Sequence, residues 1–450
     1  MVKNDTDYDL AILGGSLSSR LAACAAAQRG ARVALIAPNW QESDVVESML
    51  ETLWASTLPV STPYLPGTLS HTDVKERWSK LLIWQRYQRQ HAALSPAILS
   101  SQGIDVILEP VKFTQQQTLK SEHRHLRASC YLLADGYRLL PFVTSCVLQC
   151  HRLPELEKIP SSVAVVGYGA TAAEWAYALS RVTTVTLISS TRQLLPAEDQ
   201  DIQRLGEAQL RSLGITIVVS ENCSQPGEDI LVTASKYADQ VVVAPQTDTW
   251  DTIGLENLDI KLPVVVNRYL QTRCANIYAV GGGLGGENRA ELTQQETAIV
   301  LNNALFKRRH VMRYDTVCYS INLLSPIGHW GLTERQARWR YGSRVELFQA
   351  SSLPMDAVHA AQLNFCKLIT VGPQLLGVHL MGKGASILAA ALGKTTTIKT
   401  LSQWTLERFQ SGTLQEAIYQ ASERWQNRHW REGSWRRDWA ENWFNWRRSR

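Results

Sequence analysis

Residues 159–175 read IPSSVAVVGYGATAAEW, an apolar run followed by a glycine turn and an alanine-rich stretch. The run from 162 to 166 is typical of a buried strand in a parallel sheet. Gly167 and Gly169 permit a tight turn, and Ala172 permits close packing of a following helix on the strand. The first N–H groups of such a helix attract phosphate. The stretch predicts a strand–turn–helix unit of nucleotide-binding type, although a glycine turn without a ligand has the same local pattern.

The same order of elements occurs elsewhere in the chain. Residues 8–37 read strand, glycine turn, helix and strand, which is a second βαβ unit. A third strand-to-glycine junction at residues 276–283 precedes a helical stretch at 290–306. From residue 316 to about 423, β-type runs precede helical patterns, which indicates an α+β module. The chain therefore contains two nucleotide-type units and a C-terminal module.

Composition excludes several classes of protein. The 450 residues are 45% hydrophobic and 19% charged, which is enough to bury several cores and excludes disordered and collagen-like chains. The eight cysteines are scattered, without the dense spacing of a secreted disulfide framework. The N-terminus lacks the pattern of a signal peptide, and no apolar run approaches the ~20 residues that span a bilayer. We expect a cytoplasmic protein that is not a transmembrane protein.

Six segments of the chain, including the one quoted above, carry motifs that occur in the same order in one known family. They are residues 159–175, 194–196 with Asp199, 276–281, 325–326, 331–334 with Ala337, and 377–386. In this order the chain resembles the class I pyridine nucleotide-disulfide oxidoreductases, the family of dihydrolipoamide dehydrogenase, glutathione reductase and mercuric reductase. The resemblance covers about residues 8–420.

The resemblance implies an α/β fold with two Rossmann-like nucleotide-binding domains, the NAD(P) type inserted in the FAD type, and a C-terminal α+β dimerisation domain. The FAD-type domain is expected at residues 1–150 and 270–310, and the NAD(P)-type domain at 151–269. The dimerisation domain is expected at 311–423, followed by a Trp/Arg-rich amphipathic tail at 424–450. The resemblance also implies a homodimer.

The catalytic groups of the family are missing. The family's redox dithiol is two cysteines four residues apart after the first βαβ unit, but no cysteine lies between Cys24 and Cys130. The equivalent stretch, residues 42–57, reads as an amphipathic helix. The family's C-terminal histidine is also absent, since residues 411–416 read SGTLQE and leave Glu416 without an imidazole to orient. Dithiol–disulfide chemistry of the family type is therefore excluded.

The elements implied for FAD are weakened. The second and third glycines of the first loop are replaced by Ser16 and Ser19, and the expected ribose-binding acid is Ala37. The family's Gly-Asp pair reads Gly281-Gly282. Each lost hydrogen bond to a charged or buried group costs about 1.5–3 kcal/mol, so we expect weakened FAD binding. The residues implied at the FAD site are Gly14, Gly15, Ser16, Ser19, Gly281 and Gly282.

The elements implied for NAD(P)H are better preserved. Gly167, Gly169 and Ala172 are in place, and Glu174 is the catalytic candidate, expected near the nicotinamide. The acid that would bind the adenosine ribose aligns with Ser189, so a 2′-phosphate is less repelled. Ser190 and Arg192 follow as further contacts and favour NADPH weakly, although Arg192 also fits a solvated loop.

No metal site is predicted. Two constellations, Cys146-x-x-x-Cys150-His151 and His123-x-His125, have metal-binding residue types. Neither is accompanied by a further Cys/His pair at the spacing of a structural zinc site. Buried thiols and surface imidazoles explain them better.

The C-terminal tail is rich in tryptophan and arginine. Residues 425–450 contain six of the fifteen tryptophans and seven arginines against three acids, which leaves the rest of the chain nearly neutral. This distribution argues against a nucleic-acid-binding body. On a helix, Trp435, Trp439, Trp443 and Trp446 form one stripe. The stripe fits packing on the dimerisation domain, a membrane interface or a groove on a protein partner.

Two functions are consistent with these departures. The first is a divergent FAD-dependent NAD(P)H oxidoreductase that passes hydride to a non-disulfide acceptor such as a quinone. The second is a non-catalytic dimeric scaffold or nucleotide-sensing pseudoenzyme that docks through its tail on a membrane surface or a protein complex. A peripheral position on the cytoplasmic face of a membrane is left open by the tail.

Overall fold

The computed structural model of the chain forms two compact units. Unit 1 comprises Met1–Ala197 and Glu207–Arg313, and unit 2 comprises Glu198–Gly206 and Tyr314–Arg450. The structure describes residues 6–38, 40, 49–50, 71–90, 94–134, 147–189, 191–219, 234, 236–244, 253–285, 289–353, 363–394, 411–431 and 435–448. The domain boundaries expected from the sequence stay predictions.

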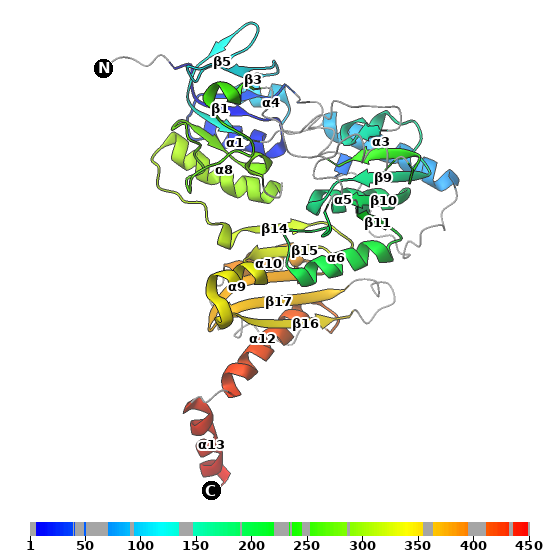
Figure 1. Ribbon diagram of the computed structural model, residues 1–450, viewed down its shortest axis with the longest axis vertical. Helices are drawn as coiled ribbons and strands as arrows, with labels where there is room; N and C mark the ends of the chain where they lie inside the picture. Colours follow the sequence, from blue (N-terminus) through cyan, green and yellow to red (C-terminus); the bar gives the residue numbers. More distant parts are fainter. Residues whose placement is uncertain are drawn as a thin grey trace. The chain divides into compact units, whose positions relative to one another are not determined.

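The first sheet of unit 1 is parallel throughout and has the strand order β13-β7-β1-β2-β3. Its strands are β1 (Tyr8–Leu13), β2 (Val33–Ile36), β3 (Ile104–Ile107), β7 (Ala128–Leu133) and β13 (Ile277–Ala279). Helix α1 (Leu17–Ala27) connects β1 to β2 and packs on α8 (Ala290–Leu305) (Figure 1). The predicted βαβ unit at residues 8–37 is confirmed.

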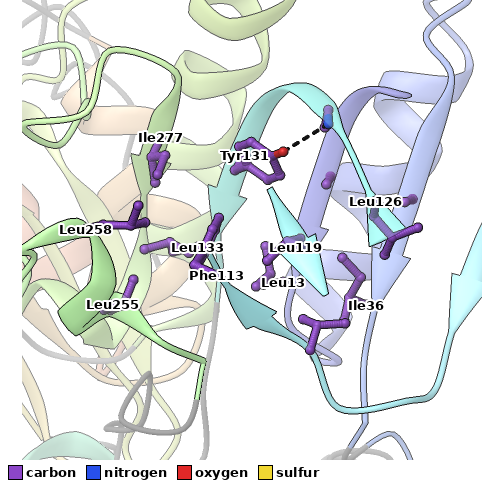
Figure 2. Packing of buried hydrophobic residues seen from close by; sticks show 14 of the residues in the cluster. Leu13, Ile36, Phe113, Leu119, Leu126, Tyr131, Leu133, Leu255, Leu258 and Ile277 are labelled. Carbon is purple, nitrogen blue, oxygen red and sulfur yellow. Dashed lines mark hydrogen bonds between the residues drawn. The ribbon is translucent and has the colours of Figure 1, made fainter. Parts of the chain in front are cut away.

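A small antiparallel sheet extends the core of this part of unit 1. Its strands are β4 (Lys112–Phe113), β5 (Leu119–Lys120) and β6 (His125–Leu126). Figure 2 shows their apolar side chains packed with residues of β1, β2 and β7 and with Leu255 and Leu258. Tyr131 lies fully buried there, and its hydroxyl accepts the N–H of Ala128 at 3.0 Å. This packing joins segments that are far apart in the sequence.

The second sheet of unit 1 is also parallel, with the order β11-β10-β9-β12-β8. Its strands are β8 (Val147–Gln149), β9 (Ser162–Val166), β10 (Thr184–Ser189), β11 (Thr216–Val219) and β12 (Gln240–Val243). Helix α5 (Gly169–Ser180) connects β9 to β10 and is buried along almost its whole length. The strand–turn–helix predicted at residues 159–175 is confirmed.

Unit 2 contains an antiparallel sheet with the order β14-β15-β18-β17-β16. Its strands are β14 (Cys318–Ile321), β15 (Ile327–Gly331), β16 (Glu346–Ser352), β17 (Asn364–Val371) and β18 (Gln374–Met381). Helices α10 (Ala385–Gly393) and α12 (Leu414–Arg431) pack on it around one apolar core (Figure 1). The predicted α+β module is confirmed.

Four further helices are α3 (His71–Gln90), α4 (Pro96–Ser101), α6 (Gln200–Ser212) and α9 (Glu334–Tyr341). None of the helices in the described ranges combines the length and apolar character needed to cross a bilayer. The helix expected at residues 42–57 lies outside the described residues, apart from Met49 and Leu50. Residues 395–410 of the expected α+β module lie outside them as well.

The tail divides into two parts. Helix α12 continues to Arg431, and Trp425 packs into the core of unit 2, where its indole N–H donates to the carbonyl of Gly372 at 3.1 Å. The last helix, α13 (Trp435–Arg448), carries the predicted stripe. The exposed fractions of Trp439, Trp443 and Trp446 are 60%, 44% and 46%. These three tryptophans are therefore not buried by the described part of their own chain.

A buried ion cluster fixes the start of α6 in unit 2. The ammonium of Lys367 on β17 is fully buried and lies 2.7 Å from Asp199, 2.7 Å from Asp201 and 2.8 Å from Glu334. Burial alone would lower the pKa of Lys367, but hydrogen bonds to the three carboxylates raise it above its ordinary value. The charge of Lys367 is thus retained inside unit 2.

Candidate nucleotide-binding sites

The turn between β9 and α5 requires glycine. Gly169 has a φ of +75°, and Gly167 has a φ of +157°. A Cβ atom on Gly167 would approach the side chains of Ala172 and Ala244 to 3.1 Å. Tyr168 caps α5 without a side-chain hydrogen bond to the first turn, within the described part of the chain. The N–H of Gly169 donates to the carbonyl of Leu194 at 2.9 Å. The backbone of this turn therefore keeps the close helix–strand packing that suits a bound pyrophosphate.

Glu174 lies in the second turn of α5 and is buried in an ion pair. The two terminal nitrogens of Arg289 donate to its carboxylate oxygens at 2.7 and 3.0 Å. Arg289 is the residue that caps the start of α8, next to the third glycine junction. The pair thus joins α5, beside the second parallel sheet, to the start of α8, which packs on α1. No motif in the sequence marked Arg289, because its partner lies 115 residues away.

The third glycine junction is closed by a carboxylate from α8. Gly281, with a φ of +76°, begins a short 3₁₀ turn (Gly281–Leu284). Its N–H donates to the buried carboxylate of Glu296 at 2.7 Å. Gly282 is buried and occupies the position where the resemblance implies an aspartate. Glu296 therefore holds the backbone of the junction.

The loop between β1 and α1 is partly capped by its own side chains. Gly14 has a φ of +151°, and the glycine turn expected there is present. The hydroxyl of Ser16 accepts the N–H of Ser19 at 3.3 Å, and the two hydroxyls lie 3.2 Å apart. The guanidinium of Arg20 donates to the carbonyl of Gly15 at 2.9 Å and lies 3.8 Å over the ring of Trp40. One donor that would face a pyrophosphate is thus already used.

The fit of FAD to these residues is therefore partial. The backbone of the loop fits a dinucleotide, and two serine hydroxyls are present that can donate to phosphate oxygens. Ala37 is buried at the end of β2 and supplies no carboxylate for a ribose. In the turn before α5, the N–H groups of Gly167 and Gly169 donate to the carbonyls of Ile188 and Leu194, so two of its donors are engaged as well.

The described residues directly after β10, up to residue 197, contain no acid. The hydroxyl of Ser189 donates to the carbonyl of Thr191 at 2.9 Å and accepts its N–H at 3.2 Å, so it closes a turn. Ser190 lies outside the described residues, and Arg192 is exposed. The site residues inferred for this loop stay predictions.

The remaining candidates are placed as follows. The thiol of Cys150 is buried and donates to the carbonyl of Val243 at 3.0 Å, and burial raises its pKa well above its ordinary value. Cys146 lies outside the described residues, and His123 is exposed. Glu416 accepts the N–H of Gly412 at 2.7 Å at the start of α12, which is a structural contact.

Three comparisons place this chain among known proteins. Residues 8–298, more than half of the chain, match the family model for pyridine nucleotide-disulphide oxidoreductase. A mercuric reductase of Staphylococcus aureus is 27% identical over 432 residues, which cover 86% of this chain and 77% of the relative. A dihydrolipoyl dehydrogenase of Bacillus subtilis (strain 168) is 24% identical and covers 93% of this chain and 98% of the relative.

Solved structures share the fold. LpdA (Rv3303c) from Mycobacterium tuberculosis superimposes with a TM-score of 0.67 at 18% identity and covers 92% of this chain and 99% of its own. The HOCl-induced flavoprotein disulfide reductase RclA from Escherichia coli gives a TM-score of 0.65 at 19% identity, with coverage of 91% and 98%. With its two Rossmann-like sheets, its α+β module and the match over residues 8–298, the chain belongs to the pyridine nucleotide-disulphide oxidoreductase family.

Proposed function

We propose that this chain is an FAD-dependent NAD(P)H oxidoreductase that passes hydride to an acceptor other than a disulfide. The observation that carries the proposal is the intact turn at Gly167 and Gly169, combined with the absence of any cysteine between Cys24 and Cys130. The first supports nucleotide binding, and the second removes the family's dithiol as the next electron carrier. A quinone is an acceptor of suitable chemistry.

Each proposed residue has a physical role. The N-terminal end of α5 attracts the pyrophosphate of NAD(P)H through the helix dipole, and Gly167 and Gly169 allow its close approach. Ser16 and Ser19 donate their hydroxyls to the FAD pyrophosphate, and Gly14, Gly15, Gly281 and Gly282 leave room for the cofactor backbone. When bound, FAD accepts two electrons as hydride and releases them to the acceptor. Glu174, held by Arg289, orients the nicotinamide end of the site rather than transferring a proton.

A preference for NADPH follows from the loop after β10. Ser189 and Ser190 present no carboxylate to a 2′-phosphate, and Arg192 supplies a cation. Arg192→Ala should weaken NADPH binding severalfold and leave NADH binding unchanged, measured by isothermal titration with each nucleotide. Equal losses for both nucleotides would contradict this assignment.

The visible spectrum of the purified protein, with the denatured supernatant tested for FAD, is the test of the main proposal. We expect flavin that NADPH or NADH bleaches and that a quinone or ferricyanide reoxidises. Lipoamide and glutathione disulfide should not reoxidise it. Rapid reduction of either disulfide would contradict the assignment of a non-disulfide acceptor.

A second function has an observation of its own in its favour. The hydroxyl of Ser16 already caps α1, and α13 presents exposed tryptophans, which suit a homodimeric scaffold or nucleotide sensor that docks on a membrane surface or a protein complex. Such a protein would act at a cytoplasmic face. A colourless protein that stays colourless after incubation with FAD would favour this function over the first.

A further inference from the structure

Three titratable side chains converge inside unit 2. Glu198, His329 and His379 are almost fully buried, and one ligand atom of each lies within 4.8 Å of the other two. His329 on β15 and His379 on β18 are direct partners across the antiparallel pair, so their imidazoles stand on the same face of the sheet. Glu198 comes from the segment that precedes α6.

Both imidazoles are oriented by backbone carbonyls. Nε2 of His329 lies 3.0 Å from the carbonyl of Gly331, and Nε2 of His379 lies 3.0 Å from the carbonyl of Leu332. A carbonyl only accepts, so each Nε2 carries a proton and each Nδ1 is left for another contact. Metal-binding histidines are commonly held in this way, with the second nitrogen donating to a carbonyl.

The carboxylate is oriented as well. Oε1 of Glu198 accepts the hydroxyl of Tyr319 at 2.6 Å, and Oε2 lies 3.0 Å from Nδ1 of His329. A metal ion bound to both atoms at about 2.0–2.1 Å in tetrahedral geometry would hold them about 3.3 Å apart. The two atoms therefore already stand at nearly the separation of two ligands.

The pair of Glu198 and His329 does not account for one feature of His379. Its Nδ1 is buried, and no described residue forms a hydrogen bond with it. A buried nitrogen without a partner is unfavourable, and a ligand bond would offset that cost. Its Nε2 is already engaged by Leu332, so Nδ1 is the nitrogen available to a third ligand position.

The side chains around the cluster carry an excess of negative charge. Four carboxylates, of Glu198, Asp199, Asp201 and Glu334, face two basic side chains, Lys367 and Arg338. With neutral imidazoles, two negative charges are in excess. A divalent ion would make the set neutral, which reduces the cost of burying the ion.

A neighbouring trio of carboxylates shows the contrast. Asp199, Asp201 and Glu334 also converge, but the ammonium of Lys367 lies among them at 2.7–2.8 Å. The ammonium of Lys367 therefore occupies the position that a metal ion would need. Glu198 forms no ion pair with a lysine or arginine among the residues that the structure describes.

We propose that Glu198, His329 and His379 form a buried three-ligand site for one divalent transition-metal ion, for which Zn²⁺ is the best match to two imidazoles and one carboxylate. The ion would hold the segment from Glu198 against β15 and β18 and so stabilise unit 2. Since all three ligands are buried, the ion is bound during folding. The proposal does not depend on nucleotide binding.

The test is metal analysis of the full-length chain without a polyhistidine tag, produced in zinc-supplemented medium. We expect about one zinc per chain after gel filtration. Refolding with Co²⁺ after removal of zinc in denaturant and chelator should give ligand-field absorption near the red end of the spectrum, where oxidised flavin does not absorb. The zinc-free refolded protein should unfold at lower denaturant concentration.

Substitutions separate this site from surface binding. Glu198→Gln and His379→Gln should each lose the zinc, whereas His123→Gln, at an exposed histidine, should keep it. If a variant fails to fold, the wild-type protein still decides the matter. Absence of zinc and of a Co²⁺ spectrum in the wild-type protein, or zinc retained in a folded Glu198→Gln variant, would overturn the proposal and leave a buried ion pair.

Discussion

Arg289 and Glu174 form a buried, two-pronged ion pair between residues 115 positions apart in the chain. The guanidinium and carboxylate planes are matched by two hydrogen bonds, which is the strongest geometry that this pair of side chains adopts. The pair neutralises Glu174 inside unit 1 and fixes the start of α8 to α5. A cofactor bound at either glycine turn would therefore meet a rigid junction.

Arg289→Met should destabilise the protein by about 3–5 kcal/mol, because it leaves the carboxylate of Glu174 buried without its cation. The free energy of unfolding in urea measures the change. Arg211→Met is the matched control, since Arg211 forms an exposed pair with Glu207 at 2.8 Å, of a kind that contributes about 0.3–0.5 kcal/mol. Equal effects of the two substitutions would contradict the role of the buried pair.

Gly167→Ala should weaken NADPH binding by about tenfold or more, because the added Cβ would press on Ala172 and Ala244 and shift the start of α5. Fluorescence titration with NADPH measures the loss. Gly30→Ala is the control, since Gly30 has a φ of +85° but no atom within 4 Å of the added Cβ. The control should lower stability by about 1–2 kcal/mol and leave binding unchanged. Unchanged binding in Gly167→Ala would rule out this turn as the nucleotide site.

Tyr8 should make the stability of unit 1 depend on pH in the alkaline range. Burial and the hydrogen bond that its hydroxyl donates to Asp105 raise the pKa of Tyr8 from 10.0 to about 12. The unfolded chain loses this proton first, so the contribution is complete below pH 10 and is lost as pH rises toward 12. The difference in free energy of unfolding between wild type and Tyr8→Phe should therefore shrink between about pH 10 and about pH 12. A constant difference would contradict the shift.

The tail should bind anionic lipid vesicles through α13. Trp443→Ala combined with Trp446→Ala removes two exposed aromatic side chains and should lower the bound fraction severalfold in a sedimentation assay. Binding should also fall as salt rises from about 0.05 M to about 0.5 M, because the arginines of α13 are then screened. Trp339→Ala is the control, at a tryptophan of α9 that is 87% exposed. Equal binding after removal of residues 435–450 would contradict lipid binding through α13 and favour a protein partner.

Local patterns in the sequence predicted the elements of the fold closely. The runs expected at residues 8–13 and 162–166 are strands β1 and β9, and the helix expected at 290–306 is α8. These patterns are reliable because alternation, apolar runs and glycine turns express the geometry of the backbone itself. They also located the glycine loops, and the absence of cysteines between Cys24 and Cys130 already excluded the family's dithiol chemistry.

The pairing of charged side chains was decided only by the tertiary structure. Glu174 was singled out from its motif, but its partner Arg289 was not, and neither was Glu296 as the acceptor for Gly281. Glu198 and His329 meet across 131 residues, and Lys367 and Asp199 across 168. No periodicity in the sequence predicts these contacts. They depend on the order of the strands in each sheet and on which helix begins beside which strand.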